Sequence, residues 1–412
     1  MKNKVIALSI TALFIGIIFC PVSEGLIKDD NNYKILENNA IKDILFDKYI
    51  TLMMKFAHKP SVSCCIIIND SVAWSKAYGF YDINNNKPAT TDTLYLTASV
   101  SKTVTATALM QLYEQGLFDL DDDVNNYLPF SLRNPFYPET PITFRMLLSH
   151  RSSLADDNFF WLCLSYIPGD PDIPDYPYPW LKEYLTPNGS AYSSRVWSNS
   201  PPGSKLYYAN IGYSLIGYLV ELLSGQTFDQ YCKDHIFKPL EMYNTSFRLK
   251  DVNISNLAVP YEYKNRKYLP HPHYGMHVIY PSACMRTSIE EYSHFIIAHM
   301  NGGKYKDIRI LNETTVELMH TAYYPIGINK WNYGLGWMID KTFFGGKKIG
   351  HGGGWPGVHT LASIRPDKDI AIIIFTNCLD SELKSTLLEK RSFNQIKNAL
   401  LIKANILTKL FN

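Results

Sequence analysis

A serine and a lysine three positions apart, Ser99 and Lys102, are the first residues whose types and spacing could support chemistry. They lie in the run TASVSKT at residues 97–103, which follows a strand-like run at 93–96 and begins a predicted helix ending near residue 117. Residues three apart share one face of a helix, and the free N–H groups at a helix N-terminus favour developing negative charge. The pattern therefore predicts a serine nucleophile activated by a lysine.

The S-x-x-K pattern alone has little specificity. Serine and lysine are common, so about one or two chance matches are expected in a chain of this length. A second match, Ser381 with Lys384, stands at the polar start of a predicted C-terminal helix, where Ser381 is expected to be a helix cap. By the pattern alone Ser99 would also be a cap more often than a nucleophile, so its context must decide.

Two further motifs place functional groups downstream of this serine. Tyr208 and Asn210 form a Y-x-N pattern that follows Pro202-Gly203 and precedes a predicted apolar helix. The run HGGGWPG at residues 351–357 stands between two strand-like segments. Two competing matches lack such neighbours, Tyr263 with Asn265 and His273 with Gly275. Taken singly, neither residue indicates catalysis. Tyr208 is one of 29 tyrosines in the chain, and His351 is a histidine in a glycine-rich turn.

The motifs together are far more specific than any one of them. They occur with the runs ITFRMLLSH (142–150), FKPLEMYNTSF (237–247) and YGLGW (333–337). In this order and spacing the chain resembles the serine β-lactamase-related family, which comprises class C β-lactamases, D-alanyl-D-alanine carboxypeptidases and related esterases and peptidases. The resemblance covers roughly residues 45–380. It implies an α+β fold of the β-lactamase/transpeptidase type, an antiparallel sheet flanked by helices with a helical insertion.

The resemblance also implies roles for the first two motifs. Ser99 matches the nucleophile, Lys102 its lysine and Tyr208 the general base. Asn210 matches the asparagine that contacts the substrate amide and the lysine. Because the ordinary pKa of tyrosine is about 10, the positive charge of Lys102 is expected to stabilise a Tyr208 phenolate.

His351, Gly352 and Gly353 occupy the third motif of the family, which binds substrate. The backbone N–H of Gly354 falls where the family forms an oxyanion hole with that of Ser99, and such a donor is worth ~3–4 kcal/mol of barrier. Glycines at these positions let the strand approach a substrate closely. Many relatives have threonine at the position of Gly352, and His351 is a weaker cation than lysine, with an ordinary pKa near 6.5. Both departures weaken the prediction of a penicillin or D-Ala-D-Ala site.

We therefore expect an exported serine hydrolase that cleaves an ester or amide bond through an acyl-enzyme on Ser99. Two alternatives remain open. One is a D,D-carboxypeptidase or β-lactamase acting on peptidoglycan stems or β-lactams, and the other is a catalytically inactive relative that binds peptide or glycan. Aromatic residues of the middle region either line an apolar cleft or pack an irregular segment; they are Trp161, Tyr166, Tyr176, Tyr178, Trp180 and Trp197.

Composition argues against several classes of function. Of the 412 residues 46% are hydrophobic and 19% are charged, and the formal net charge is +2. This balance argues against binding of nucleic acid or of an anionic membrane by bulk charge. The sequence has no H-E-x-x-H pattern, Cys/His array, phosphate loop or dinucleotide fingerprint. We expect a small-molecule or peptide substrate, and neither a metal, another cofactor, a nucleic acid nor a stable partner.

The N-terminus is predicted to be a signal peptide over residues 1–25. Lys2 and Lys4 precede an apolar run at 5–19, and Ser23 and Gly25 are the small residues of a cleavage site. The run is shorter than the ~18 residues of a good membrane span. We expect a secreted or extracytoplasmic protein, or an anchored one if cleavage does not occur. Five asparagines open glycosylation sequons, Asn69, Asn188, Asn244, Asn253 and Asn312.

The remaining residues, 26–412, are expected to form one β-lactamase-related domain. A helix is predicted at 34–58 and a hairpin at 61–68 and 72–78, with further strands at 335–339, 347–350, 359–364 and 370–375. Strands at both ends predict one antiparallel sheet built from distant segments. The α/β part is expected at about 30–130 and 281–412, and the helical insertion at about 131–280. No disulfide is assigned among the six cysteines after the signal peptide.

Overall fold

The computed structural model describes residues 31–156, 167–168, 180–275, 279–322, 332–341, 346–379 and 387–411. The chain divides into two compact units, Met1–His58 with Ser385–Ala399, and Lys59–Lys384 with Leu400–Asn412. In the first unit α2 (Asn31–Phe56) and the first part of α12 (Leu387–Phe411) are joined by a hydrogen bond from Tyr49 to Gln395 of 3.3 Å. Among the helices described, none has the length and apolar character needed to cross a membrane.

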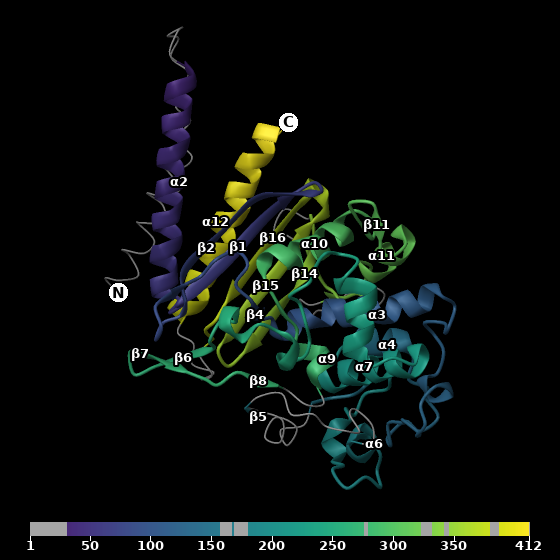
Figure 1. The fold of residues 1–412 in the computed structure, drawn as a ribbon. Helices are drawn as coiled ribbons and strands as arrows, with labels where there is room; N and C mark the ends of the chain where they lie inside the picture. The colour runs from purple at the N-terminus through teal and green to yellow at the C-terminus, as the bar shows by residue number, and fades with distance from the viewer. Residues whose placement is uncertain are drawn as a thin grey trace. The chain divides into compact units, whose positions relative to one another are not determined.

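The second unit is built on an antiparallel sheet of eight strands in the described ranges, ordered β12-β13-β14-β15-β16-β1-β2-β3 (Figure 1). Their bounds are Asn332–Tyr333, Met338–Lys341, Lys347–Trp355, Val358–Arg365, Ile370–Thr376, Ser61–Ile68, Ser71–Asp82 and Lys87–Pro88. The two central strands, β1 and β16, lie far apart in the sequence and pair with each other. Val62 lies opposite Thr376, and Ile68 lies opposite Ile370. The predicted antiparallel sheet of distant segments is thus confirmed.

The two central strands are apolar along their whole length. Every residue of β1 and β16 is buried, because both faces of the sheet are covered at this point. Helix α10 (Ile289–Met300) packs against both strands on one face (Figure 1). The turn before β2 contains Asn69 with a φ of 56°, a left-handed conformation that asparagine tolerates better than most residues.

Strands β13 and β14 differ from their predicted bounds. Strand β13 begins at Met338 rather than at residue 335, because Gly336 has a φ of 90° and Gly334 donates a backbone hydrogen bond to Trp337 across a tight turn. Strand β14 continues beyond Gly350 to Trp355, because its glycines keep pairing with β15. The glycine-rich run is therefore part of a strand, which gives it a fixed backbone direction.

A layer of helices lies beside the sheet and holds Ser99, the predicted nucleophile (Figure 1). It consists of η1 (Ala98–Val100), α3 (Ser101–Glu114), α4 (Phe144–Leu148), α7 (Asn210–Ser224), α8 (Phe228–Cys232), η4 (Lys233–Phe237) and α9 (Tyr280–Ala283). Helix α3 contacts α7 and α9, while η1 contacts β14 and β15. The predicted helix at 99–117 ends earlier, at Glu114, and Gly116 follows with a φ of 71°.

Short elements complete the unit. Helices α6 (Trp180–Leu185) and α11 (Glu313–Met319) are accompanied by the strand pairs β4 (Tyr95–Leu96) with β9 (Arg286–Thr287), β5 (Ile167–Pro168) with β8 (Tyr274–Gly275), β6 (Tyr261–Lys264) with β7 (Lys267–Pro270), and β10 (Lys304–Tyr305) with β11 (Ile308–Arg309). The short 3-10 turns are η2 (Val124–Asn126), η3 (Ser194–Val196), η5 (Leu249–Asp251), η6 (Ile254–Asn256) and η8 (Pro366–Lys368). The described part of the predicted insertion belongs to the same compact unit as the sheet.

Candidate active site

Ser99 is presented on a buried turn. It is half-buried, whereas every other residue from 93 to 112 is buried. The preceding residue, Ala98, has a φ of 48°, which is a strained conformation for a residue with a side chain. Such strain persists only where the surrounding structure enforces it, and it clusters at functional sites. The turn therefore exposes the serine hydroxyl from an otherwise closed core.

Lys102 lies one turn further on, in the first turn of α3, and its side chain is fully buried. Its Nζ is 3.1 Å from Ser99 Oγ, 2.7 Å from Asn210 Oδ1 and 2.9 Å from the carbonyl oxygen of Ser282. The predicted approach of Ser99, Lys102 and Asn210 is thus present in the structure. Three oxygen atoms surround one amine nitrogen.

Tyr208 lies beside this amine, directly before α7. The centre of its ring is 5.0 Å from Lys102 Nζ. Burial raises the pKa of Tyr208, and the interaction of its hydroxyl with Ser99 opposes that rise only in part. Burial also lowers the pKa of Lys102 to about 7, against the opposing charge of Asp156. These directions disfavour the Tyr208 phenolate expected from the sequence, and they favour a neutral lysine.

Asn210 is the first residue of α7, and its amide is held on its other side by Asp156. The carboxylate accepts hydrogen bonds from the backbone N–H and from Nδ2 of Asn210, at 3.0 and 2.8 Å, and from the backbone N–H of Ile211, at 3.2 Å. Residue Ala209, at the N-cap position, provides no side-chain cap. The sequence analysis missed Asp156, although an uncapped helix start after the Y-x-N motif is a signal that an acceptor must come from elsewhere.

Strand β14 lies directly against the turn that holds Ser99. A Cβ atom added to Gly353 would be 2.2 Å from Thr97 O, 2.2 Å from Thr360 Oγ1 and 3.2 Å from Ser99 N. Thr360 Oγ1 donates a hydrogen bond of 2.7 Å to Thr97 O and so joins the sheet to this turn. Gly353 is therefore required for close packing. Gly354, the predicted oxyanion donor, is the next residue and is exposed.

His351 is buried, and both of its ring nitrogens have protein partners. Nδ1 lies 2.7 Å from Gly352 O and Nε2 lies 2.6 Å from Tyr333 Oη. Because a carbonyl only accepts, Nδ1 carries the hydrogen and Tyr333 donates to Nε2. Burial and the nearby Lys102 charge lower the pKa of His351 to about 3. The ring is neutral, so the substrate contact predicted for His351 would not involve a positive charge.

Other rings close the site from behind. His150, which ends the sequence run at 142–150, is 4.2 Å from the ring of Tyr208, 4.9 Å from Tyr213 and 4.6 Å from Tyr333. Its Nδ1 accepts the backbone N–H of Ala209 at 3.2 Å. Burial holds the pKa of His150 well below its usual range. The rings of Tyr208 and Tyr213 lie 5.0 and 5.6 Å from Lys102 Nζ, and the positions of Tyr213 and Tyr333 were not foreseen from the sequence.

The competing motifs lie elsewhere. Tyr263 is on β6, and Asn265 is in the turn that leads to β7, with a φ of 52°. Gly275 is on β8. Ser381 and Lys384 lie outside the described residues, as do Trp161, Tyr166, Tyr176 and Tyr178 of the aromatic region. Trp180 stacks on Tyr184 at 4.6 Å and Trp197 is buried, so these two pack within the protein.

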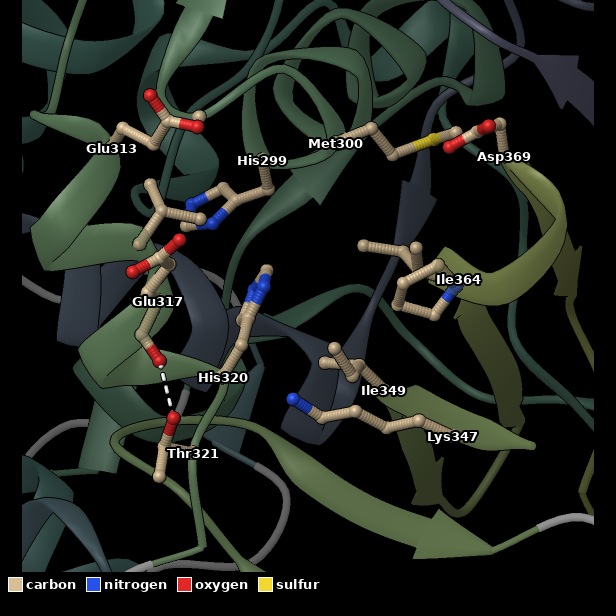
Figure 2. A pocket seen from close by; sticks show the side chains of 13 residues that line it. His299, Met300, Glu313, Glu317, His320, Thr321, Lys347, Ile349, Ile364 and Asp369 are labelled. Atoms are coloured by element: carbon tan, nitrogen blue, oxygen red, sulfur yellow. Dashed lines mark hydrogen bonds between the residues drawn. The ribbon is translucent and has the colours of Figure 1, made fainter. Parts of the chain in front are cut away.

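A separate pocket of about 480 Å³ lies between α10, α11 and the outer ends of β14 and β15 (Figure 2). His299, His320 and Lys347 line it, and the side chain of Lys347 reaches toward His320 (Figure 2). Within the described ranges His299 Nδ1 and His320 Nε2 have no hydrogen-bond partner. No three His, Cys, Asp or Glu side chains of those ranges come together as a metal ion would need. The pocket contains none of the residues that surround Ser99.

A family model, curated proteins and solved structures each match most of this chain. The family model described as Beta-lactamase matches residues 46–391. Protein flp of Staphylococcus aureus (strain MW2) is 25% identical over 356 residues, which are 86% of this chain and 66% of that protein, so the chain spans slightly less than two thirds of these curated relatives. The octameric penicillin-binding protein homologue from Pyrococcus abyssi has a TM-score of 0.69 and 25% identity, covering 86% of this chain and 77% of its own.

A third match concerns the fold alone. The D-amino acid amidase from Ochrobactrum anthropi SV3, solved with L-phenylalanine amide, has a TM-score of 0.68 at 20% identity and covers 87% of this chain and 99% of its own. The similarity in fold therefore covers nearly the whole of the amidase.

Proposed function

The chain belongs to the Beta-lactamase family, and from this premise we propose that it is a serine hydrolase that cleaves an ester or amide bond through an acyl-enzyme on Ser99. The observation that supports this most directly is the contact of 3.1 Å between Lys102 Nζ and Ser99 Oγ. A base within hydrogen-bond reach of a nucleophile is the first geometric requirement of acyl transfer.

The surroundings of the amine support a neutral lysine as that base. A neutral amine has two N–H bonds and one lone pair. Asn210 Oδ1 and Ser282 O can only accept, at 2.7 and 2.9 Å, so they take the two N–H bonds. The lone pair is then directed at Ser99 Oγ. Since burial lowers the pKa of Lys102 to about 7, a large fraction of the enzyme has this form near neutral pH.

The proposed reaction begins with transfer of the Ser99 hydroxyl proton to Lys102 Nζ. The Ser99 oxygen bonds to the carbonyl carbon, and the backbone N–H groups of Ser99 and Gly354 hold the resulting oxyanion. The bond to the leaving group then breaks, and the proton passes from Lys102 through the Tyr208 hydroxyl to the departing oxygen or nitrogen. Tyr208 acts as a protonated relay, in agreement with its raised pKa. Water then cleaves the acyl-enzyme by the reverse proton path, releasing a carboxylic acid and restoring Ser99.

The third motif favours substrates without a carboxylate at this end of the site. His351 is neutral, and both its nitrogens are engaged by Tyr333 and Gly352. Gly352 also lacks the hydroxyl that many relatives have. An anionic group of a penicillin or of a D-Ala-D-Ala peptide would thus meet neither a cation nor a hydroxyl at the third motif. Neutral esters and amides are the substrates that we expect.

The test is intact-mass analysis with a fluorophosphonate and, separately, with a penicillin, each beside Ser99→Ala. We expect a fluorophosphonate adduct on the native enzyme, its loss in the variant, and no penicillin adduct or consumption. A penicillin adduct, or its consumption, would instead favour a D,D-carboxypeptidase or β-lactamase. Failure of the fluorophosphonate to label the folded native protein would contradict the proposal and favour a binding relative.

We also propose that the protein is exported and glycosylated. The predicted signal segment supports export, and the asparagine of each of the five sequons is exposed. Expression in a eukaryotic secretory host should yield protein in the medium that begins after residue 25 and loses mass on treatment with an N-glycosidase. Retention inside the cells with an intact N-terminus would overturn the export, and an unchanged mass the glycosylation.

A further inference from the structure

We propose that Asp156 is a positioning residue of this site: its carboxylate fixes the Asn210 amide so that the oxygen faces Lys102, and it keeps a negative charge near the lysine. This inference rests on the proposed function of Ser99 and Lys102. It extends the site to a residue that lies outside the three motifs.

The orientation of the Asn210 amide decides what Lys102 can do. With Oδ1 toward the amine, Asn210 accepts one of its N–H bonds, and the lone pair is left for Ser99. With the amide reversed, Nδ2 would donate to the amine and occupy that lone pair. The base would then be blocked without any movement of Lys102. Asn210 alone has no preference strong enough to prevent this, since the two ends of an amide are nearly the same in shape.

Asp156 supplies the preference. Its Oδ2 lies 2.8 Å from Asn210 Nδ2 and 3.0 Å from the backbone N–H of Asn210. A carboxylate only accepts, so it stabilises the nitrogen end of the amide on its own side. Its Oδ1 meets the backbone N–H of Ile211 at 3.2 Å and so anchors the carboxylate to the start of α7. The two backbone N–H groups therefore hold the Asp156 carboxylate in place whichever way the Asn210 amide is turned.

Asp156 also acts on the charge of the lysine. Burial raises the pKa of Asp156, whereas the three hydrogen bonds and the Lys102 charge lower it. In return the Asp156 charge raises the pKa of Lys102 against the larger effect of burial. Two tyrosines of the described ranges also face the amine, Tyr208 and Tyr213, with ring centres 5.0 and 5.6 Å from Nζ.

Two histidines complete the electrostatic surroundings of the amine. The pKa values of His150 and His351 are both lowered by burial and by Lys102. Both rings are therefore neutral when the lysine titrates. Among the described residues, Asp156 is then the charged group whose effect on the pKa of Lys102 opposes that of burial.

The experiment measures the rate of fluorophosphonate labelling of the full chain between pH 5 and 9, by intact mass, for Asp156→Ala and Asp156→Asn. For Asp156→Ala we expect labelling about 100-fold slower, the size of effect that misplacement within a catalytic group produces. Asp156→Asn retains an acceptor for the Asn210 amide but removes the charge. We expect it to label within about tenfold of the native rate above pH 8, with its acidic limb moved to lower pH.

A double-variant cycle distinguishes positioning from a general loss of structure. If Asp156 acts through Asn210, adding Asp156→Ala to Asn210→Ala should slow labelling by less than about threefold. The matched control is Glu221→Ala. Glu221 lies on α7, where it accepts the backbone N–H of Phe228 at 2.9 Å. It is likewise a carboxylate that binds a helix start, but that start belongs to α8 and not to the Ser99 site. Its loss should lower thermal stability and leave the labelling rate and its pH profile unchanged.

The outcomes separate the two proposals. A native protein that is not labelled on Ser99 overturns the proposed function and this inference with it. A labelled native protein, with Asp156→Ala equally fast or with fully additive losses in the cycle, overturns only the role of Asp156. If Asp156→Ala does not fold, the Asp156→Asn profile decides, because an acidic limb at the native pH contradicts the inference.

Discussion

Two buried polar regions of the sheet unit differ in how their nitrogen atoms are partnered. Around Lys102 two of the three partners of the amine are fixed: Asp156 holds the Asn210 amide, and the Ser282 carbonyl is part of the α9 backbone. In the pocket of Figure 2, His299 Nδ1 and His320 Nε2 have no hydrogen-bond partner within the described ranges. Burial lowers the pKa of both histidines, so they are neutral.

The difference separates a buried group that is prepared for chemistry from one that is merely buried. Both regions bury basic groups and lower the pKa values of those groups. Only the first combines that shift with a directed lone pair and a nucleophile at 3.1 Å. A shifted pKa or a sizeable cavity is thus a weak guide to function without a connected network.

The largest expected effect comes from removing the amine. Lys102→Ala should slow fluorophosphonate labelling and hydrolysis by about 10²–10⁴-fold, the range for loss of a general base. The variant also removes buried methylene groups and leaves Asn210 Oδ1 and Ser282 O without the amine, so the free energy of unfolding should fall as well. The measurement is the labelling rate beside a thermal melt. Labelling at the native rate would mean that the buried amine of Lys102, like the buried histidines of the pocket, takes no part in the reaction.

The second effect is the pH dependence of kcat/KM. A base must be unprotonated to accept the Ser99 proton, so activity should rise with pH and level off above the lowered pKa of Lys102, about 7. Below that value the rate should fall by roughly tenfold per pH unit. A profile measured with a neutral ester tests this. An acidic limb near the ordinary lysine pKa, or its absence between pH 5 and 9, would contradict the assigned base.

The third effect concerns the contact between sheet and turn. Gly353→Ala would place a Cβ atom 2.2 Å from Thr97 O, and overpacking of this kind costs about 1–3 kcal/mol in the free energy of unfolding. The matched variant for stability is Gly352→Ala, where the nearest atom, Thr360 O, is 3.8 Å away. Chemical denaturation should show a clear loss for the first and little change for the second. Equal stabilities would mean that β14 is not pressed against the Ser99 turn.

The smallest effect is expected in the second region. His320→Leu removes a buried nitrogen without a partner, so stability at pH 7 should change by less than about 1 kcal/mol, and labelling should be unchanged. Because burial lowers the folded-state pKa of His320 from 6.5 to about 3, the unfolded chain binds the proton first, and the native protein loses stability as pH falls below 6.5. The variant should lose less. A variant with slower labelling would connect the two regions.

Local patterns in the sequence predicted the strands of the sheet and the contact of Ser99 with Lys102, whereas the roles of these two residues remain predictions from the resemblance. Strand β1 has the predicted bounds 61–68, as its apolar run is buried on both faces. The base was harder to predict, because it depends on burial: Lys102 and Tyr208 shift in opposite directions in the same environment. Asp156 was missed because its role arises from contact with Asn210, 54 positions away in the chain.

The pairing of β1 with β16 sets the point in synthesis at which the surroundings of Ser99 can be completed. Ser99 and Lys102 leave the ribosome well before Gly354 and the strands β15 and β16 beside it. The sheet cannot close until Ile370–Thr376 pairs with Ser61–Ile68. Contacts between such distant segments form slowly. A nascent chain that has not yet reached Thr376 therefore lacks the closed sheet that presses β14 against the Ser99 turn.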